Sequence, residues 1–319
     1  YLSGVESGLA RDHQRLQGAL ERLNLSPMGA AALAGSSHLL DREYTARLLG
    51  FSAPVENTYD AVGSSDWQTE LAAVVQVSAV ALSRVLHDLL YWASRGFITL
   101  PDGLVQGSSI MPQKRNPVAL EHARARFSKA TGVAMATLFS SHNIPYGDLN
   151  DPGPDIQASL EKMFDEYASG VALLSACMSG LEVDVAAWRS KAKTGDTTAT
   201  ELADVLSQRH QLPFQQSHKV VAQLVRDMKA AGRPLLDAKP EDLSRAGGPQ
   251  VEQEALSEAL SALAFIERRR TYGGPNPGVV REHLSRAATR LEADCQQAGK
   301  LDRDFRLASR ELGTKRKEQ

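Results

Sequence analysis

The feature that most constrains the fold is a long stretch, residues 66–94, that contains neither proline nor glycine. Because either residue weakens or breaks a helix interior, their absence permits one continuous helix over the whole stretch. Apolar or small residues recur there at three- and four-residue steps: Trp67, Leu71, Val74, Val75, Ser78, Leu82, Val85, Leu86 and Leu89. This spacing predicts an amphipathic helix well above the average length of ~11–12 residues.

Two further stretches, residues 117–141 and 155–178, also predict long helices. The apolar residues of the second share one face: Ile156, Leu160, Met163, Phe164, Tyr167, Val171 and Leu174. Long helices with broad apolar stripes pack together as a bundle. We expect other subunits to bury part of this surface, including the stripe of Trp67, Leu71 and Leu82; a monomeric bundle is the alternative.

The pattern changes near residue 190, where shorter helical segments begin. The expected helices of this region are 200–209, 214–231, 251–268 and 277–298. Turns that contain glycine and proline separate them, and no stretch indicates a sheet. We therefore expect an all-α fold, with a long central helical bundle domain in residues 1–190 and a small helical C-terminal domain in residues 191–319.

Composition argues against several classes of function. The formal net charge of −2 gives no reason to expect nucleic-acid binding. No apolar run approaches the ~20 residues needed to cross a bilayer, so no membrane partner is expected. Cys177 and Cys295 lie far apart in the sequence, and free thiols are typical of a reducing cytoplasm, the expected location. No Cys and His residues have the spacing of a metal site.

Residues 107–117, Gly-Ser-Ser-Ile-Met-Pro-Gln-Lys-Arg-Asn-Pro, carry the most chemistry in the chain. A glycine and two prolines give the segment a defined shape. Its polar side chains are two hydroxyls, an amine and a carboxamide, from Ser108, Ser109, Lys114 and Asn116. Asn116 and Pro117 would be the N-cap and first residue of the following helix, and a helix N-terminus beside a lysine suits an anion. An ordinary capped loop is the alternative.

This loop resembles the signature loop of the fumarase/aspartase superfamily, Gly-Ser-Ser-x-Met-Pro-x-Lys-x-Asn-Pro, at every specified position. Within the superfamily the chain resembles the argininosuccinate lyases along almost its whole length. The matching text includes Leu25-Ser26-Pro27-Met28-Gly29-Ala30, Ala34-Gly35, Asp41-Arg42-Glu43, Leu49-Gly50-Phe51, Glu56-Asn57, Asp60-Ala61-Val62, Thr198-Ala199-Thr200-Glu201-Leu202-Ala203-Asp204 and Tyr272-Gly273-Gly274-Pro275. The resemblance implies a lyase that eliminates an amine from an N-substituted aspartate, releases fumarate and needs no cofactor. It also implies a homotetramer in which each active site draws on three subunits.

The resemblance further implies roles for the loop. Ser108 would be the general base, acting as an alkoxide, which requires backbone N–H groups and a nearby cation to lower the pKa of its hydroxyl. Lys114 would stabilise the dianionic intermediate that forms when the Cβ proton leaves, and Asn116 would orient the same carboxylate. The remaining substrate contacts of the loop would come from Ser109, Met111 and Gln113. A purely structural role for these residues is the alternative.

Glu121 lies one turn into the helix after the loop, where the family's glutamate pairs with a catalytic histidine. That histidine belongs to a Thr-His segment that has no equivalent in this sequence. The family's Ser-Arg-Asn-Asp segment, which binds a carboxylate, has none either. Because the sequence also opens in mid-pattern at Tyr1, we expect the chain to be part of a longer protein. A solvated side chain is the alternative for Glu121, and His142 is a further candidate.

Residues 142–156 depart from the family pattern. Argininosuccinate lyases have here a Tyr-Asn-x-Asp-Leu-Gln-Glu-Asp-Lys type of segment, whose tyrosine, glutamine and lysine hold the amino-acid end of the leaving group. Tyr146 matches the tyrosine and Asn150 the glutamine, but the segment is acidic and lacks lysine. It therefore suits an amine better than an α-carboxylate, which makes an aminopolycarboxylate lyase resembling ethylenediamine-disuccinate lyase an alternative. An adenylosuccinate-type lyase and a catalytically silent, crystallin-like homologue are the others.

Overall fold

The computed structural model describes residues 1–148 and 153–318, and its contacts divide the chain into two units. The bundle unit comprises residues 1–182 and 289–319, and the helical unit comprises residues 183–288. The sequence predicts a single C-terminal domain over residues 191–319. The structure instead places the stretch from residue 289 onward with the bundle unit, because this stretch contacts the first helix of the chain.

The bundle unit is built almost entirely from helices. They are α1 (Leu2–Leu23), α2 (Arg42–Leu49), α3 (Thr58–Gly63), α4 (Asp66–Ser94), the 3-10 helix η1 (Asp102–Leu104), α5 (Val118–Ser140) and α6 (Gly153–Gly180). The strands have two residues each: β1 (Leu25–Ser26), β2 (Ala53–Pro54), β3 (Ile98–Thr99) and β4 (Glu182–Val183). β1 and β2 form a parallel pair in which Leu25 faces Ala53 and Ser26 faces Pro54. The expected all-α fold is therefore confirmed.

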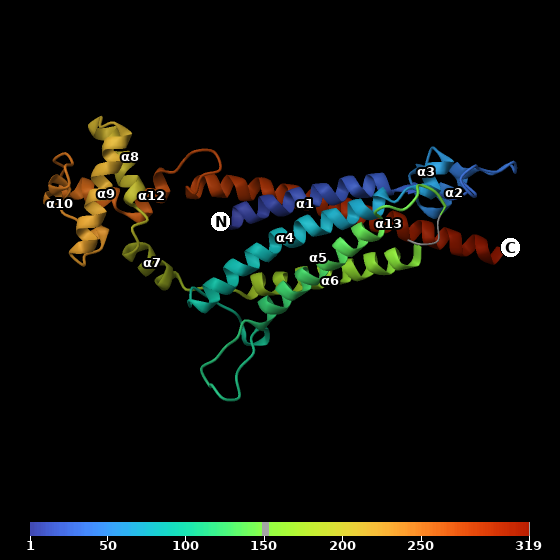
Figure 1. Ribbon diagram of the computed structural model, residues 1–319, viewed down its shortest axis with the longest axis horizontal. Coiled ribbons are helices and arrows are strands. Elements are labelled where there is room, and N and C mark those ends of the chain that lie inside the picture. Colours follow the sequence, from blue (N-terminus) through green and yellow to red (C-terminus); the bar gives the residue numbers. More distant parts are fainter. Residues whose placement is uncertain (149–152, 319) are drawn as a thin grey trace. The chain divides into compact units, whose positions relative to one another are not determined.

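The core of the bundle unit lies between its long helices. α5 packs against both α4 and α6, and α1 packs against α4, so that these helices run side by side (Figure 1). Phe127 of α5 is fully buried in this core. Gly170 of α6 allows the close approach, because a Cβ at that position would lie 2.9 Å from Cε1 of Phe127.

The helix expected over residues 66–94 is confirmed as α4, and most of its apolar face turns inward. Leu71 and Leu82 are only 7% and 4% exposed, because they lie in the core of the bundle unit itself, whereas Trp67 is 38% exposed. Their expected place on an intersubunit stripe is therefore wrong for the two leucines. Among the described residues, α4 is the one helix that could cross a membrane by length and composition alone. Its eight buried residues are those of a bundle core helix.

The last helix, α13 (Pro277–Glu318), is much longer than the expected 277–298. Its part within the bundle unit lies along α1 (Figure 1). The Gln17 amide donates to Oε1 of Gln297 at 2.9 Å, and Arg290 forms an ion pair with Glu6. These contacts outweigh the interruption at Gly299, since one glycine in a helix costs only about 1 kcal/mol.

The helical unit consists of short helices around a separate core. They are α7 (Val185–Thr194), α8 (Ala199–His210), α9 (Phe214–Ala230), η2 (Leu235–Asp237), α10 (Pro240–Arg245), α11 (Gln253–Ala259) and α12 (Ala262–Arg268). The single helix expected over residues 251–268 is wrong, because α11 ends at Ala259 and a new helix begins at Ala262. There Ser261 caps α12, its Oγ accepting a hydrogen bond from the Ala264 N–H at 3.4 Å.

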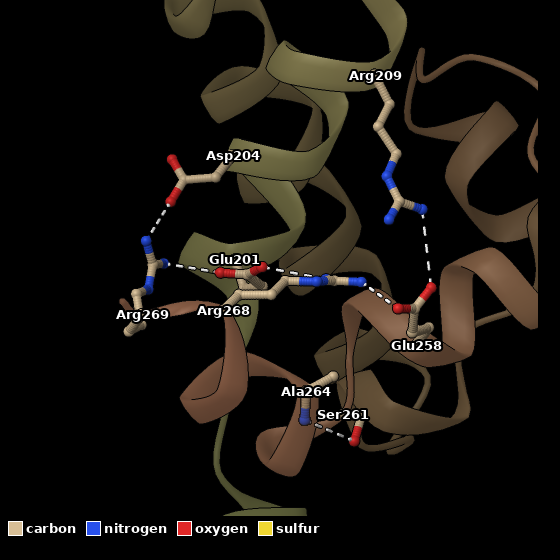
Figure 2. A network of polar contacts seen from close by, with 8 residues as sticks. All are labelled: Glu201, Asp204, Arg209, Glu258, Ser261, Ala264, Arg268 and Arg269. Carbon is tan, nitrogen blue, oxygen red and sulfur yellow. Dashed lines mark hydrogen bonds and ion pairs between the residues drawn. The ribbon is translucent and has the colours of Figure 1, made fainter. Parts of the chain in front are cut away.

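A charged network ties α8 to α11 and α12 in this unit (Figure 2). The Glu201 side chain, only 4% exposed, accepts a hydrogen bond from Arg268 at 3.1 Å and forms an ion pair with Arg269 at 2.9 Å. Each arginine has a second partner, Glu258 at 2.5 Å and Asp204 at 2.9 Å respectively. Glu201 and Asp204 belong to the family-like 198–204 text, and here both pair with arginines of the same unit.

Candidate active site

The signature loop, residues 107–117, is closed at its neck by its own backbone. Gln106 and Asn116 exchange two main-chain hydrogen bonds of 2.9 Å each, so the loop leaves and re-enters the bundle unit at one point. Arg115 fixes that neck, because one of its guanidinium nitrogens donates to the Leu100 carbonyl at 3.0 Å and another pairs with Asp102. From this anchored neck the loop extends away from the helices (Figure 1).

Within the loop, the side chain of Ser108 is held by two backbone donors. Its half-buried Oγ accepts hydrogen bonds from the backbone N–H groups of Ile110 at 3.2 Å and Met111 at 3.1 Å. Donors that point at an oxygen favour its anionic form and so lower the pKa of its hydroxyl. The neighbouring Ser109 is exposed. The geometry therefore provides, for Ser108, the backbone donors that an alkoxide base requires.

Three further side chains that we expect in the site lie on the exposed surface of the loop. Lys114 and Gln113 are exposed, and Met111 is 40% exposed. The Lys114 backbone N–H donates to the Met111 carbonyl at 3.0 Å, which tightens the turn. Among the described residues the Lys114 amine has no ion-pair partner, so this positive charge is available to an anion.

The expected capping of α5 is wrong by one residue. The helix begins at Val118, so Pro117 is the N-cap and not the first helical residue, and no side chain caps the helix there. The reason is that the Asn116 backbone is engaged with Gln106 in the neck. Glu121 lies in the first turn of α5 and its side chain is exposed.

Tyr146 lies beyond the other end of α5 in the chain. This helix has 23 residues, which at ~1.5 Å per residue makes it about 34 Å long. Ser108 precedes the helix and Tyr146 follows it, so α5 separates them in one chain. Asn150 lies outside the described residues. Of the expected site residues, the structure thus brings together those of the loop and Glu121, but not Tyr146.

Tyr146 lies instead against α3. Its hydroxyl donates to Oδ1 of Asp60 at 2.6 Å, and its ring stacks on that of Tyr59, with centroids 5.7 Å apart. The hydrogen bond to Asp60 raises the pKa of the Tyr146 phenol, and nearby carboxylate charge raises it further. Sequence reasoning missed this cluster, although the Asp60-Ala61-Val62 text resembles the family.

Metal ligands do not gather at either place. Among the residues that the structure describes, no group of three or more His, Cys, Asp or Glu side chains is arranged to hold a metal ion. The functional groups at these two places are hydroxyls, carboxylates, an amine and backbone N–H donors.

Comparison with known families gives two matches that follow the two units. The family model described as "Lyase" matches residues 1–132, and the one described as "Argininosuccinate lyase C-terminal" matches residues 196–267. The first covers the signature loop and ends within α5. The second covers α8 to α11 and most of α12; it includes Glu201, Asp204 and Glu258 and ends just before Arg268.

Individual relatives agree with these matches. The argininosuccinate lyase of Thermus thermophilus is 40% identical over 90% of this chain and 62% of its own length. That of Methanosarcina mazei is 34% identical over 94% of this chain and, again, 62% of its own length. The chain thus spans less than two thirds of these curated relatives.

A solved structure extends the likeness to three dimensions. The crystal structure of EDDS lyase in complex with formate superposes with a TM-score of 0.90 at 26% identity, covering 98% of this chain and 64% of that one. The signature loop, the helical architecture and the family matches agree. The chain belongs to the fumarase/aspartase superfamily of lyases, as an argininosuccinate lyase-like member.

Proposed function

We propose that this chain belongs to a carbon–nitrogen lyase of the argininosuccinate lyase type, which eliminates an amine from an N-substituted aspartate and releases fumarate. The observation that carries this proposal is the Ser108 hydroxyl, which accepts two backbone N–H hydrogen bonds inside a loop with a fixed neck. The 40% identity to the argininosuccinate lyase of Thermus thermophilus supports the substrate class.

In the proposed reaction Ser108, as an alkoxide, removes a proton from the Cβ next to a carboxylate of the succinyl unit. That carboxylate becomes a dianion, and the fixed donors around it supply most of the stabilisation. Lys114 offers the positive charge and Asn116 a carboxamide donor. The electron pair left by the proton then forms the double bond of fumarate, while the C–N bond breaks and the amine leaves with its electrons.

The active site of this proposal is shared between chains of a homotetramer. Ser108 precedes and Tyr146 follows α5, a helix about 34 Å long, so we infer that one small substrate meets both residues only when they come from different subunits. Exposed apolar residues on α4 offer surface for such an assembly; they are Trp67, Val77, Val80 and Tyr91. Glu121, exposed beside the loop, would pair there with a histidine from another part of the protein.

Mixing two inactive variants of the full-length protein tests the shared site. Ser108→Ala and Tyr146→Ala should each lose activity, but refolding them together should restore part of it. Some sites of the mixed oligomers would then receive a native Ser108 and a native Tyr146. Activity no higher than the mean of the two variants would contradict sharing.

Fumarate release from a panel of N-succinyl amines tests the reaction itself. Argininosuccinate should be turned over by the full-length protein, and a succinylated diamine is the second candidate. The observation in favour of the diamine is that residues 142–148 contain no lysine or arginine, together with the likeness to EDDS lyase. Adenylosuccinate should not be cleaved. A protein that releases fumarate from none of them would be a silent homologue.

The free thiols support a reducing location, the cytoplasm. Cys177 is buried and Cys295 is exposed, and neither forms a disulfide. An exposed thiol of this kind persists where the compartment keeps cysteines reduced.

A further inference from the structure

The hydroxyl of Tyr146 has a defined donor role in this structure. It donates its proton to Oδ1 of Asp60 at 2.6 Å, and the tyrosine as a whole is 58% exposed. A phenol has only one proton. Once that proton is held by the carboxylate, the oxygen can offer a ligand nothing but lone pairs.

The arrangement is braced from α3 and does not depend on Tyr146 alone. The Tyr59 hydroxyl donates to the Tyr146 carbonyl at 2.9 Å, while the two rings stack with an interplanar angle of 24°. Asn57 caps α3, its Oδ1 accepting from the backbone N–H groups of Tyr59 at 2.8 Å and Asp60 at 3.1 Å. Both partners of Tyr146 are therefore fixed by the start of one short helix.

The last residue of α3, Gly63, lies close to the backbone of Gly147, the residue after Tyr146. A Cβ at Gly63 would lie 3.2 Å from the backbone nitrogen of Gly147, which is tighter than ordinary contact. The glycine at position 63 thus lets the backbone after Tyr146 approach the helix. The contacts of Tyr59 and Asp60 at the start of α3, and of Gly63 at its end, together hold Tyr146 in place.

The electrostatic character of this cluster is negative. Asp60 and Asp66 both raise the pKa of the Tyr146 phenol, and Asp148 follows it closely in the sequence. Residues 57–66 and 142–148 contain no lysine or arginine. A carboxylate placed here would meet acceptor oxygens and like charge, whereas an ammonium would meet acceptors and opposite charge.

We propose that Asp60 is a positioning residue that sets the specificity of the leaving-amine end, because it fixes the Tyr146 hydroxyl as an acceptor and so selects a terminal ammonium rather than a terminal carboxylate. This inference rests on the proposed function, which brings Tyr146 to the leaving amine of the substrate. Argininosuccinate carries both groups at that end. The prediction is that its ammonium is recognised here and that its carboxylate contributes little.

Three substrates separate the two groups, each a fumarate adduct at a guanidino nitrogen. They are the adducts of arginine, of agmatine, which lacks the carboxylate, and of 5-guanidinopentanoate, which lacks the ammonium. With the full-length enzyme, loss of the ammonium should lower kcat/KM about ten- to a hundredfold, as for a lost charge-assisted contact. Loss of the carboxylate should lower it less than about fivefold, as for an exposed, weakly paired charge.

Two variants then assign the selectivity to the pair. Asp60→Asn removes the negative charge and should abolish most of the preference for the ammonium. The kcat/KM for the arginine adduct should then lie within about fivefold of the kcat/KM for the 5-guanidinopentanoate adduct. Tyr146→Phe keeps the ring stack, removes the hydroxyl and should have the same effect, with the double variant no worse than either single one. The matched control is Tyr59→Phe, which removes only the bond to the Tyr146 carbonyl and should retain the selectivity.

The outcomes distinguish this inference from the proposed function. If the wild-type enzyme releases no fumarate from any adduct, the proposed function fails and the inference with it. If it does turn over the arginine adduct, but the ammonium contributes less than the carboxylate, only the inference is overturned. The same holds if both Asp60→Asn and Tyr146→Phe leave the selectivity unchanged.

Discussion

The Glu201 network gives the sharpest prediction of stability. Glu201→Gln keeps the size of the side chain and removes the charge that faces Arg268 and Arg269 (Figure 2). The side-chain amide oxygen can still accept a hydrogen bond from one guanidinium. The amide NH2 group then faces the second guanidinium, to which it cannot bond because both groups are donors. The variant loses at least one charge-assisted hydrogen bond, which is worth about 1.5–3 kcal/mol.

The remaining contacts limit the magnitude. Arg268 and Arg269 are 26% and 31% exposed and keep Glu258 and Asp204, so neither guanidinium is left buried without a partner. The loss should therefore stay below the 3–5 kcal/mol typical of a broken buried pair. We expect the free energy of unfolding of the helical unit to fall by about 2 kcal/mol.

Urea denaturation can follow this unit separately, because Trp188 is the tryptophan that lies within it. With Trp67 and Trp92 replaced by phenylalanine, the fluorescence of Trp188 should report a lower midpoint at an unchanged slope. Arg209→Ala is the control: its 3.7 Å pair with Glu258 joins side chains that are both 52% exposed. It should cost less than about 1 kcal/mol. A midpoint for Glu201→Gln no lower than that of this control would refute the reasoning.

Three other predictions follow from the bundle unit. Gly170→Ala should destabilise the bundle unit by about 1–3 kcal/mol, because the added Cβ overpacks against Phe127. The control Gly132→Ala, which has nothing within 4 Å of its added Cβ, should not lower the melting temperature. Equal shifts in melting temperature for the two variants would contradict this account. Arg126 donates a hydrogen bond to Glu166 at 2.7 Å and lowers the pKa of that carboxyl. The ionised Glu166 therefore stabilises the fold above the ordinary carboxyl pKa of ~4.3, and this stabilisation is lost as the pH falls through the lowered pKa. Glu166→Gln should flatten the loss of stability in acid, and an unchanged acid curve would rule this out. Light scattering on the full-length protein should give the mass of a tetramer, and a clean monomer at micromolar concentration would exclude the shared site.

Periodicity predicted the long helices well, because nothing in those stretches competes with a helix. The expected 117–141 is observed as Val118–Ser140, and the expected 214–231 as Phe214–Ala230. The predicted helix boundaries are wrong where the local sequence allows either a continuing helix or a break, and tertiary contacts decide between them. Ser261 could equally continue a helix or cap one, and α13 passes Gly299 because it lies along α1.

The candidate site could be predicted only in part, for the same physical reason. The side chains of Ser108 and Lys114 are visible in the sequence, but the donors to Ser108 are backbone N–H groups of Ile110 and Met111. Every residue except proline supplies such a group, so no sequence signal marks them. Tyr146 and Asp60 are 86 residues apart, and their pairing follows from the path of the chain.

The rate of fumarate release by full-length Ser108→Ala tests the central claim most directly. If Ser108 removes the Cβ proton, kcat should fall about 10²–10⁴-fold, the usual contribution of a general base. KM should change little, because the binding groups remain. Turnover within about threefold of wild type would show that another group is the base, and would contradict the account.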